Sequence, residues 1–343
     1  MKAAERQRRH ERHVEEHLRP SVPLEGRTLV VSPKILKLSS NDTARRTIRF
    51  FRKMYRIAVQ ERGVALVDLS ALVDASTPAL TVMAAEIARC LEIAPGSVQG
   101  IAPTSASMSH LLDRYGVSAA LGLPVASDGS AVGVLRIRNG LAEEIRRTEF
   151  LDRFLDPVFP EDTPLKGRVK GAVTEALLNI VDHAYPADIA RTDVCPSGRW
   201  WISGYRSDLH KRLWLCVYDL GVGLPATLPR SRSSAIRNAI STMTGSDFIS
   251  DHKMIKLAVH TSLTQTGAQG RGRGLREMAR LIDRAGEGAL WIMSRDGTYI
   301  YGRGTHDQDV GSMTAETLRG TLIVWTIKIT DAAASDGEVP TNG

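Results

Sequence analysis

Residues 174–185 read TEALLNIVDHAY, and we expect them to lie in a helix over residues 165–184. Four polar side chains follow one face of this helix or lie beside it: Glu175, Asn179, Asp182 and His183. An amide oxygen such as that of Asn179 can complete a magnesium shell beside a triphosphate, because Mg²⁺ prefers hard oxygen ligands. A carboxylate one turn away can orient or deprotonate a hydroxyl or a water. A polar stripe alone is more often a solvated helix face, so the hypothesis depends on the rest of the chain.

Residues 215–225 read LCVYDLGVGLP, an apolar strand that runs directly into Asp219 and two glycines. An aspartate at the end of a strand can accept a hydrogen bond from an exocyclic amine such as that of adenine. Gly221 and Gly223 allow the backbone to approach a flat ring or to take a positive φ. The alternative interpretation is an ordinary Asp-x-Gly turn between two strands.

Residues 267–275 read GAQGRGRGL and precede an amphipathic helix. Glycines ahead of a helix expose N–H groups at its positive end, which suits phosphate, and two arginines add cationic donors. The candidate phosphate-binding residues are Gly270, Arg271, Gly272, Arg273, Gly274 and Leu275. A dinucleotide-binding glycine loop is the alternative, but such a loop directly follows a strand, and residues 260–266 do not have strand character.

Residues 318–327 read LRGTLIVWTI, a glycine–threonine step into an apolar strand. Taken alone, this motif is the start of a strand. Its hydroxyl, on Thr321, could assist the binding of an adenine ring.

These four motifs, in this order across residues 165–330, resemble the GHKL superfamily, which groups gyrase-type topoisomerases, heat-shock chaperones, histidine kinases and mismatch-repair ATPases. The resemblance implies a Bergerat-type ATP-binding domain, an α/β two-layer sandwich, with ATP and Mg²⁺ as cofactors. It implies that Asn179 holds Mg²⁺ and that Asp219 meets the adenine amine with Thr321 beside it. Gly221 and Gly223 would then shape the purine pocket, and the later glycines would close on the phosphates. The predicted cofactor site also includes Asp182 and His183.

Glu175 separates branches of this superfamily. The comparable helix of sensor histidine kinases usually lacks a glutamate four residues before the metal asparagine. Hydrolytic members and anti-sigma-factor serine kinases generally have it, and the wording EALLN followed by HAY is closest to the serine kinase branch. A sensor histidine kinase also needs a phosphoacceptor histidine on a dimerising helix pair. The amino-terminal histidines stand in a charged arm that two prolines interrupt: His10, His13 and His17, then Pro20 and Pro23.

Strand and helix patterns alternate from Arg27 onward, as in an α/β layer domain. The stretches VALVDLSALVDASTPALTVMAAEIARC (64–90) and SVQGIAPTSASMSHLLDRYGV (97–117) resemble STAS domains, the fold of anti-sigma-factor antagonists. A serine of the turn between strand and helix can be phosphorylated in that family, and Ser76 is the nearest position here. Capping of the following helix by Ser76 or Thr77 is the alternative role for these hydroxyls.

A chain of 343 residues accommodates two domains. We expect the following organisation: a basic flexible arm at 1–26, a STAS-like α/β domain at 27–130, an ATP-binding domain at 131–330 with a lid insert at 226–269, and a disordered tail at 331–343. Near the start of the second domain, we expect a strand over residues 132–137 and a helix from Leu141 to about Phe154.

The net charge is +7, and much of the excess Lys and Arg precedes residue 60. Such an arm can bind nucleic acid or an acidic partner, or it can simply be solvated. The three cysteines form no CxxC pair, which indicates small buried residues rather than disulfides or a zinc site. No apolar run is long enough to span a bilayer and no signal sequence is present. We therefore expect a cytoplasmic protein without a membrane partner.

The expected function is that of an ATP- and Mg²⁺-binding regulator, either a protein serine/threonine kinase or an ATPase switch. Glu175 would be its general base or the group that positions the nucleophile. The alternative is an ATP-gated conformational module that contacts a protein or nucleic-acid partner without kinase activity, and a third possibility is a binding module with a degenerate site. Both resembled families commonly work in assemblies, so a protein partner is expected; a homo-oligomer is compatible with the resemblance, but the sequence does not fix the oligomeric state.

Overall fold

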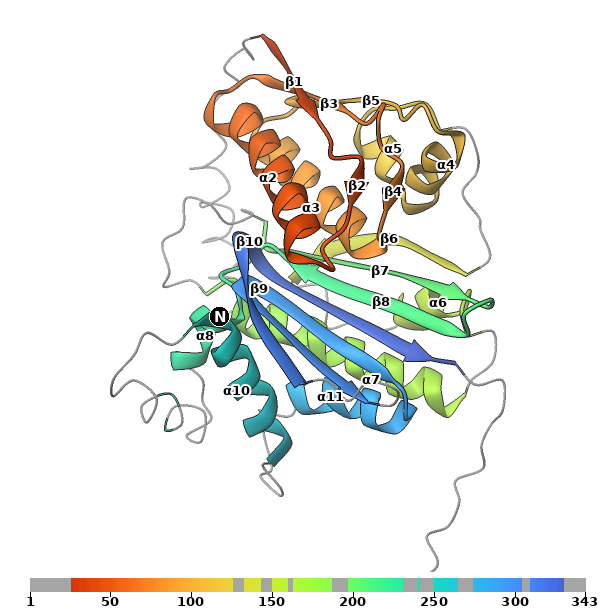
Figure 1. Ribbon diagram of the computed structural model, residues 1–343, viewed down its shortest axis with the longest axis vertical. Helices are drawn as coiled ribbons and strands as arrows, with labels where there is room; N and C mark the ends of the chain where they lie inside the picture. Colours follow the sequence, from red (N-terminus) through yellow and green to blue (C-terminus); the bar gives the residue numbers. More distant parts are fainter. Residues whose placement is uncertain are drawn as a thin grey trace, which may run out of the picture.

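The computed structural model describes residues 26–125, 133–142, 150–159, 163–186, 197–230, 238, 240, 250–264, 274–303 and 309–329. The fold is mixed α/β, with an N-terminal parallel sheet and its helices, followed by an antiparallel sheet packed against helices (Figure 1). The predicted basic arm up to residue 25, half of the predicted lid insert and the predicted tail at 331–343 lie outside the described residues. No helix within the described ranges has the length and apolar character needed to cross a membrane.

The N-terminal part alternates strands and helices, as its sequence pattern predicts. Its parallel strands pair in the order β1-β3-β5: β1 (Arg27–Val31), β3 (Val64–Asp68) and β5 (Val98–Ile101). A second, two-stranded sheet pairs β2 (Ile35–Leu36) with β4 (Asp74–Ala75). The helical elements are α2 (Asn41–Tyr55), the π-helical turn η1 (Arg56–Gln60), α3 (Thr77–Ile93), α4 (Ala106–Tyr115) and α5 (Val117–Ala120).

The C-terminal part is a five-stranded antiparallel sheet in the order β6-β7-β8-β10-β9. Its strands are β6 (Val134–Leu141), β7 (Arg199–Ser207), β8 (Arg212–Asp219), β9 (Gly288–Arg303) and β10 (Asp309–Lys328). Its helical elements are α6 (Phe150–Leu155), α7 (Pro164–Asn179), the π-helical turn η3 (Ile180–Ala184), α8 (Leu224–Thr227), the 3₁₀ turn η4 (Leu228–Arg230), α10 (Asp251–Thr264) and α11 (Gly274–Ala285). Within the predicted lid insert, the described residues other than Ser250 are helical.

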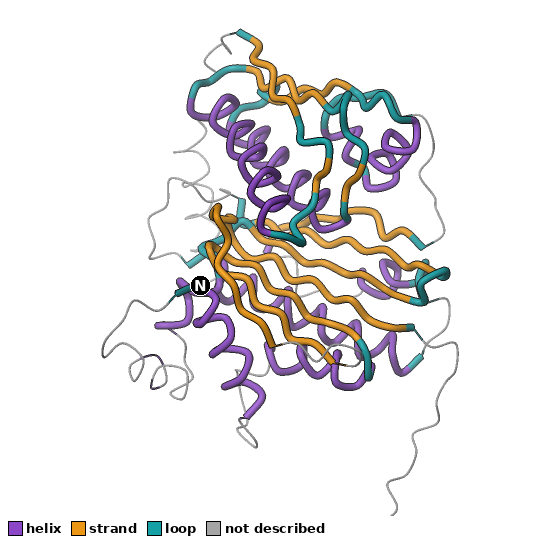
Figure 2. Tube along the Cα trace, in the orientation of Figure 1, coloured by secondary structure: helices purple, strands orange, loops and turns teal. Residues whose placement is uncertain are grey.

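Helices cover both faces of the antiparallel sheet. Successive residues of a strand point to opposite sides, so each strand contributes side chains to both cores. In β8, Leu215 and Val217 belong to the core shared with α7 and α11. Cys216 and Tyr218 point the other way, into a core that includes α2 and α3 of the N-terminal part. Figure 2 shows the resulting order of layers, with helices above and below the sheet. The N-terminal part thus covers the face of the sheet that α7 and α11 leave open.

Polar contacts accompany this interface between the two parts. Thr81 of α3 lies with its Oγ1 2.6 Å from Oγ of Ser203 and 3.2 Å from Sγ of Cys216. Glu92, in the last turn of α3, accepts hydrogen bonds from the backbone N–H and the hydroxyl of Ser197. Because these residues come from both parts and share one core, we treat the described chain as a continuous packed unit.

Two details differ from the sequence-based expectations. Leu141 belongs to β6 rather than to a helix, because it pairs with Arg199 and its carbonyl accepts the indole N–H of Trp200 at 3.1 Å. Ser76 has the extended backbone of a helix N-cap, but its side chain makes no capping hydrogen bond. Cys90 and Cys216 are buried free thiols, as expected, and Cys195 lies outside the described residues.

Candidate functional site

Three polar side chains form a row across neighbouring strands on the face of the sheet that α7 covers. Thr321 of β10 pairs with Asp219 of β8 on one side and with Ser294 of β9 on the other. They continue the phase of buried residues such as Val217 and Ile292, which belong to the core on the α7 side. Asp219 ends β8, whereas Ser294 and Thr321 lie within β9 and β10, and all three place a polar group at the same level of the sheet.

Asp219 is a buried carboxyl, with 5% of its surface exposed. Its Oδ1 accepts the N–H of Gly221 at 2.8 Å. Burial disfavours the charged form and raises the pKa of Asp219 to about 7, although hydrogen bonds from the N–H groups of Gly221 and Thr321 oppose the shift. Near pH 7 the folded protein is therefore a mixture of molecules in which Asp219 is protonated and molecules in which it is ionised.

The loop after Asp219 is tied to the end of the α7 helical segment. Val222 donates its N–H to the carbonyl of Ala184 at 2.9 Å. A Cβ on Gly221 would overlap that same carbonyl, so the close approach requires glycine. The hydroxyl of Tyr185 accepts the N–H of Leu220 at 3.0 Å and donates to a β7 carbonyl. These contacts fix where the buried aspartate lies relative to η3.

Gly223 begins the next turn with φ at +84°, in the left-handed region that favours glycine. The following N–H, of Leu224, points at two hydroxyls: Ser294 Oγ at 2.9 Å and Thr321 Oγ1 at 3.0 Å. The turn after β8 is thereby anchored to β9 and β10.

The predicted glycine-rich segment meets the predicted metal-binding helix at Gly274, the first residue of α11. A Cβ added there would lie 2.8 Å from Asn179 Nδ2, 3.3 Å from Asn179 Oδ1 and 3.3 Å from Glu175 Oε2. Glu175 and Asn179 are both half-buried in α7. The N-terminus of α11, whose first N–H groups have no acceptor within the helix, therefore abuts both predicted side chains.

The remaining predicted residues divide into three groups. Asp182 and His183 lie in η3 and are exposed, whereas Leu275 is half-buried in α11. The segment that holds Gly270, Arg271, Gly272 and Arg273 lies outside the described residues. The π-helical turn directly after Asn179 was not expected from the sequence, and such turns often occur at functional sites.

Sequence reasoning missed Ser294, which is fully buried and bonded to two of the predicted segments. The signal that could have revealed Ser294 is its position in the alternation of side chains along the strand. In LWIMS it closes an apolar run on the same alternation as Leu290 and Ile292.

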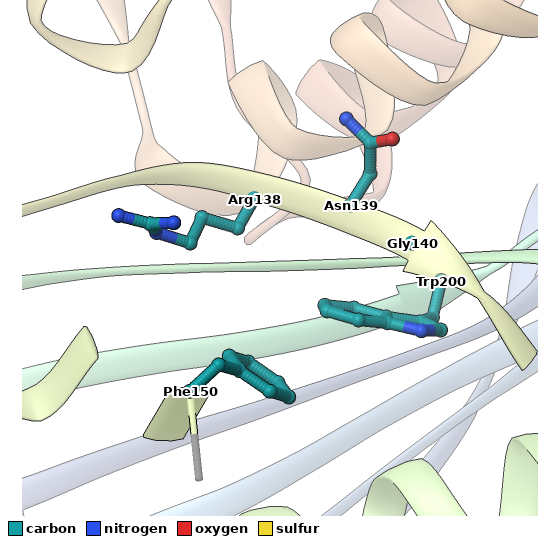
Figure 3. A pocket seen from close by; sticks show the side chains of 5 residues that line it. All are labelled: Arg138, Asn139, Gly140, Phe150 and Trp200. Atoms are coloured by element: carbon teal, nitrogen blue, oxygen red, sulfur yellow. The ribbon is translucent and has the colours of Figure 1, made fainter. Parts of the chain in front are cut away.

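A separate hollow of about 420 Å³ lies at the β6 edge of the sheet (Figure 3). Its lining residues are Arg138, Asn139, Gly140, Phe150 and Trp200. The rings of Phe150 and Trp200 stack with centroids 5.1 Å apart, which closes much of the aromatic surface. None of the predicted site residues lines this hollow. Over the described ranges, no group of three or more His, Cys, Asp or Glu side chains converges as a metal site.

No protein-family model matches the chain, and a search of curated proteins found no match. The case for a function therefore depends on the geometry of the residues themselves.

Proposed function

We propose that the C-terminal part is a Bergerat-type ATP-binding domain of the GHKL kind, and that the N-terminal part is STAS-like. The observation that carries the proposal is the convergence of four separate sequence motifs on one side of the sheet. A Cβ at Gly274 would meet Asn179 and Glu175, while Asp219 lies beside Thr321 and the loop after it is bonded to η3. If the four short motifs resembled the family only by chance, there would be no reason for them to lie close together in the fold.

The residues present fit an adenine nucleotide with Mg²⁺. A buried carboxyl at a strand end suits an exocyclic amine, because a carboxylate withdrawn from water is stabilised by hydrogen-bond donors. The glycine at the start of α11 leaves room beside Asn179 and Glu175 that a Cβ would fill. The positive end of a helix suits phosphate. Asn179 would supply a hard oxygen ligand to Mg²⁺, with the nucleotide supplying the others.

In this proposal the chain's own residues bind, orient and move a proton. Bound ATP–Mg²⁺ supplies the transferable phosphoryl group. Glu175 orients an attacking hydroxyl or water and accepts its proton at a carboxylate oxygen. Asn179 and the N-terminus of α11 neutralise charge near the phosphates, the kind of work that dominates catalysis of phosphoryl transfer.

The position of the N-terminal part bears on the acceptor. The hydroxyl of Thr77 is 2.6 Å from the hydroxyl of Tyr115, which donates to the carbonyl of Gly204 in β7. Thr81, one helical turn later, contacts Ser203 on the sheet face opposite α7. The turn that contains Ser76 and Thr77 is therefore separated by the sheet from Glu175 of the same chain. A kinase with this arrangement of domains acts on a hydroxyl of another polypeptide, which would be its protein partner.

The contact between the N-terminal part and the back of the sheet favours a second candidate, an ATP-gated conformational module. Tyr218 directly precedes Asp219 but points into the N-terminal core. Nucleotide contacts at Asp219 would then be transmitted to α2 and α3 without phosphoryl transfer.

Titration of the purified protein with Mg²⁺ and ATP in a calorimeter tests the common core of both candidates. We expect saturable binding that Asp219→Asn weakens at least about tenfold, the effect of altering a hydrogen bond to a charged group. The exposed Asp208→Asn serves as the matched control and leaves binding unchanged. γ-Labelled ATP, with Glu175→Ala beside the wild type, then separates labelled protein from released phosphate. No binding by the wild-type protein would overturn the proposal.

A further inference from the structure

Ser294 connects all three segments that meet at the buried aspartate. Its side chain is fully buried at the level of Thr321. Its hydroxyl donates to the carbonyl of Gly320 at 2.8 Å, accepts the N–H of Leu224 at 2.9 Å, and lies 3.1 Å from Thr321 Oγ1. The site residues around it belong to β10 and to the turn after β8.

The number of protons on these groups fixes the direction of the remaining hydrogen bond. A serine hydroxyl has one proton and two lone pairs. The carbonyl of Gly320 can only accept, so it takes the proton of Ser294. Between the two hydroxyls, Thr321 must therefore be the donor. Ser294 is then fully satisfied, with both lone pairs and its proton in use.

This direction determines what Thr321 can offer to a ligand. Its proton is committed to Ser294 and one lone pair accepts the N–H of Leu224 at 3.0 Å. One lone pair remains, so its hydroxyl can only accept a further hydrogen bond. Above its pKa, the neighbouring Asp219 is also an acceptor, with Oδ1 already engaged by Gly221. The row of Asp219 and Thr321 therefore presents acceptors to whatever lies beside it.

Resting on the proposed adenine site, we propose that Ser294 is a specificity-determining residue: it turns the proton of Thr321 away from the base, so that the pocket accepts a purine with a 6-amino group and rejects one with a 6-carbonyl. An amine brings protons to acceptors, whereas a carbonyl brings lone pairs to lone pairs. A buried polar group without a partner is costly, which makes such a mismatch discriminating.

ATP and inosine triphosphate are suitable probes, because the two bases differ only at position 6 and in the proton on N1. Binding of each is measured by calorimetry at pH 8.5, where Asp219 is ionised. We expect the wild type to prefer ATP at least tenfold. Ser294→Ala frees the Thr321 proton to meet a carbonyl, so the ratio of the two dissociation constants falls about fivefold, the value of roughly one hydrogen bond.

Three comparisons separate a specificity role from a general loss of structure. Ser203→Ala removes another fully buried hydroxyl of the same sheet, and it leaves the ratio unchanged. In a Thr321→Val background, Ser294→Ala also leaves the ratio unchanged, because Ser294 acts through the threonine. If Ser294→Ala fails to fold, Ser294→Cys weakens the same hydrogen bonds with a similar shape and shifts the ratio in the same direction.

The outcomes are distinguishable. A wild-type protein that binds neither nucleotide overturns the proposed function and this inference together. A wild-type protein that binds ATP, with the same ratio after Ser294→Ala as before, overturns the inference alone. So does an equal shift in the Thr321→Val background, since that would show that Ser294 acts by another route.

Discussion

Gly274 and Asn179 are so close that the glycine's missing side chain would overlap the amide: its Cβ position is 2.8 Å from Nδ2. The two residues are 95 positions apart in the chain. One begins α11 and the other ends α7, so the contact joins the two helices at the point where a regular α-helix gives way to a π-helical turn. This contact brings the predicted glycine-rich and metal-binding motifs together.

Gly274→Ala is expected to weaken binding of Mg²⁺–ATP about tenfold while leaving the protein folded. The added methyl meets the flexible ends of Asn179 and Glu175, not backbone, so these side chains move out of position. Alanine is also the better helix former, by up to about 1 kcal/mol. Calorimetric binding together with a thermal melt measures both effects. Gly167→Ala in α7, which has open space around it, is the control and leaves affinity unchanged; equal affinities for both variants would contradict the prediction.

The sequence predicts the two ends of this site better than its middle. Asp219 and Thr321 each stand where an apolar run meets glycine, so both are visible as candidates without a structure. The expected strand start at Thr321 is wrong, however, because β10 begins at Asp309 and Thr321 lies within it. Their pairing with Ser294 is not visible in the sequence, because the register between β9 and β10 shifts twice, between Met313 and Leu318 and again before Thr321. Counting along both strands from the pair Asp309–Tyr301 therefore gives Ser294 the wrong partner.

The packing of the N-terminal part on the face of the sheet opposite α7 could not be predicted from the sequence pattern either. β8 is apolar at consecutive positions, Leu215, Cys216, Val217 and Tyr218, which indicates burial on both faces. Nothing in that run indicates which element packs on the face opposite α7. The structure shows that α3 does so through Thr81 and its neighbours, a relationship that depends on how two parts of the chain dock.

Gly320→Ala is expected to destabilise the protein by about 3 kcal/mol or more. Gly320 has φ at +63°, and a Cβ would overlap the backbone carbonyl of Asp219 and lie 2.8 Å from its Oδ1. Strain of this kind costs on the order of 1–3 kcal/mol before the overlap is counted. Urea unfolding provides the measurement. Gly26→Ala has a similar φ of +61° but no atom within 4 Å, so it should lose only about 1 kcal/mol. Similar losses for both variants would show that the overlap is relieved.

Arg89→Leu is expected to destabilise the protein by about 3–5 kcal/mol, because it leaves Glu86 as an unpaired buried charge. Arg89 is fully buried, bonds Glu86 at 3.2 Å and lies over the ring of Tyr55 at 3.6 Å. Burial opposes its charge, but Glu86 and Tyr55 together hold the pKa of Arg89 above its usual value.

The double variant Arg89→Leu/Glu86→Leu should recover most of this loss, since a buried pair replaced by apolar residues is often nearly neutral. Arg280→Leu removes a pair of the same i,i+3 spacing, to Glu277, that is partly exposed, and should cost under about 1 kcal/mol. Chemical denaturation with tryptophan fluorescence measures all three variants. A loss of stability for Arg89→Leu no greater than that for Arg280→Leu would show that the buried pair is no more important for stability than an exposed one.

The raised pKa of Asp219 predicts an unusual pH dependence of stability. The carboxyl keeps its proton in the folded protein up to about pH 7, whereas an unfolded chain releases it near 3.8. Between these values the unfolded state is favoured progressively, so the free energy of unfolding falls as pH rises from about 4 to 7 and is level above. The full loss from this group is on the order of 4 kcal/mol. Asp219→Asn removes the ionisation and should remove that slope.

The difference between wild type and Asp219→Asn, from urea unfolding at a series of pH values, isolates this group from every other titration. We expect the variant to gain relative stability steadily between pH 4 and 7. The exposed Asp208→Asn should show no such trend. ATP affinity of the wild type should rise over the same range, because an ionised carboxylate accepts an amine proton better than a neutral acid does. A difference curve that stays flat from pH 4 to 7 would mean that Asp219 is ionised throughout, and that its burial is relieved by water or by donors in the folded protein.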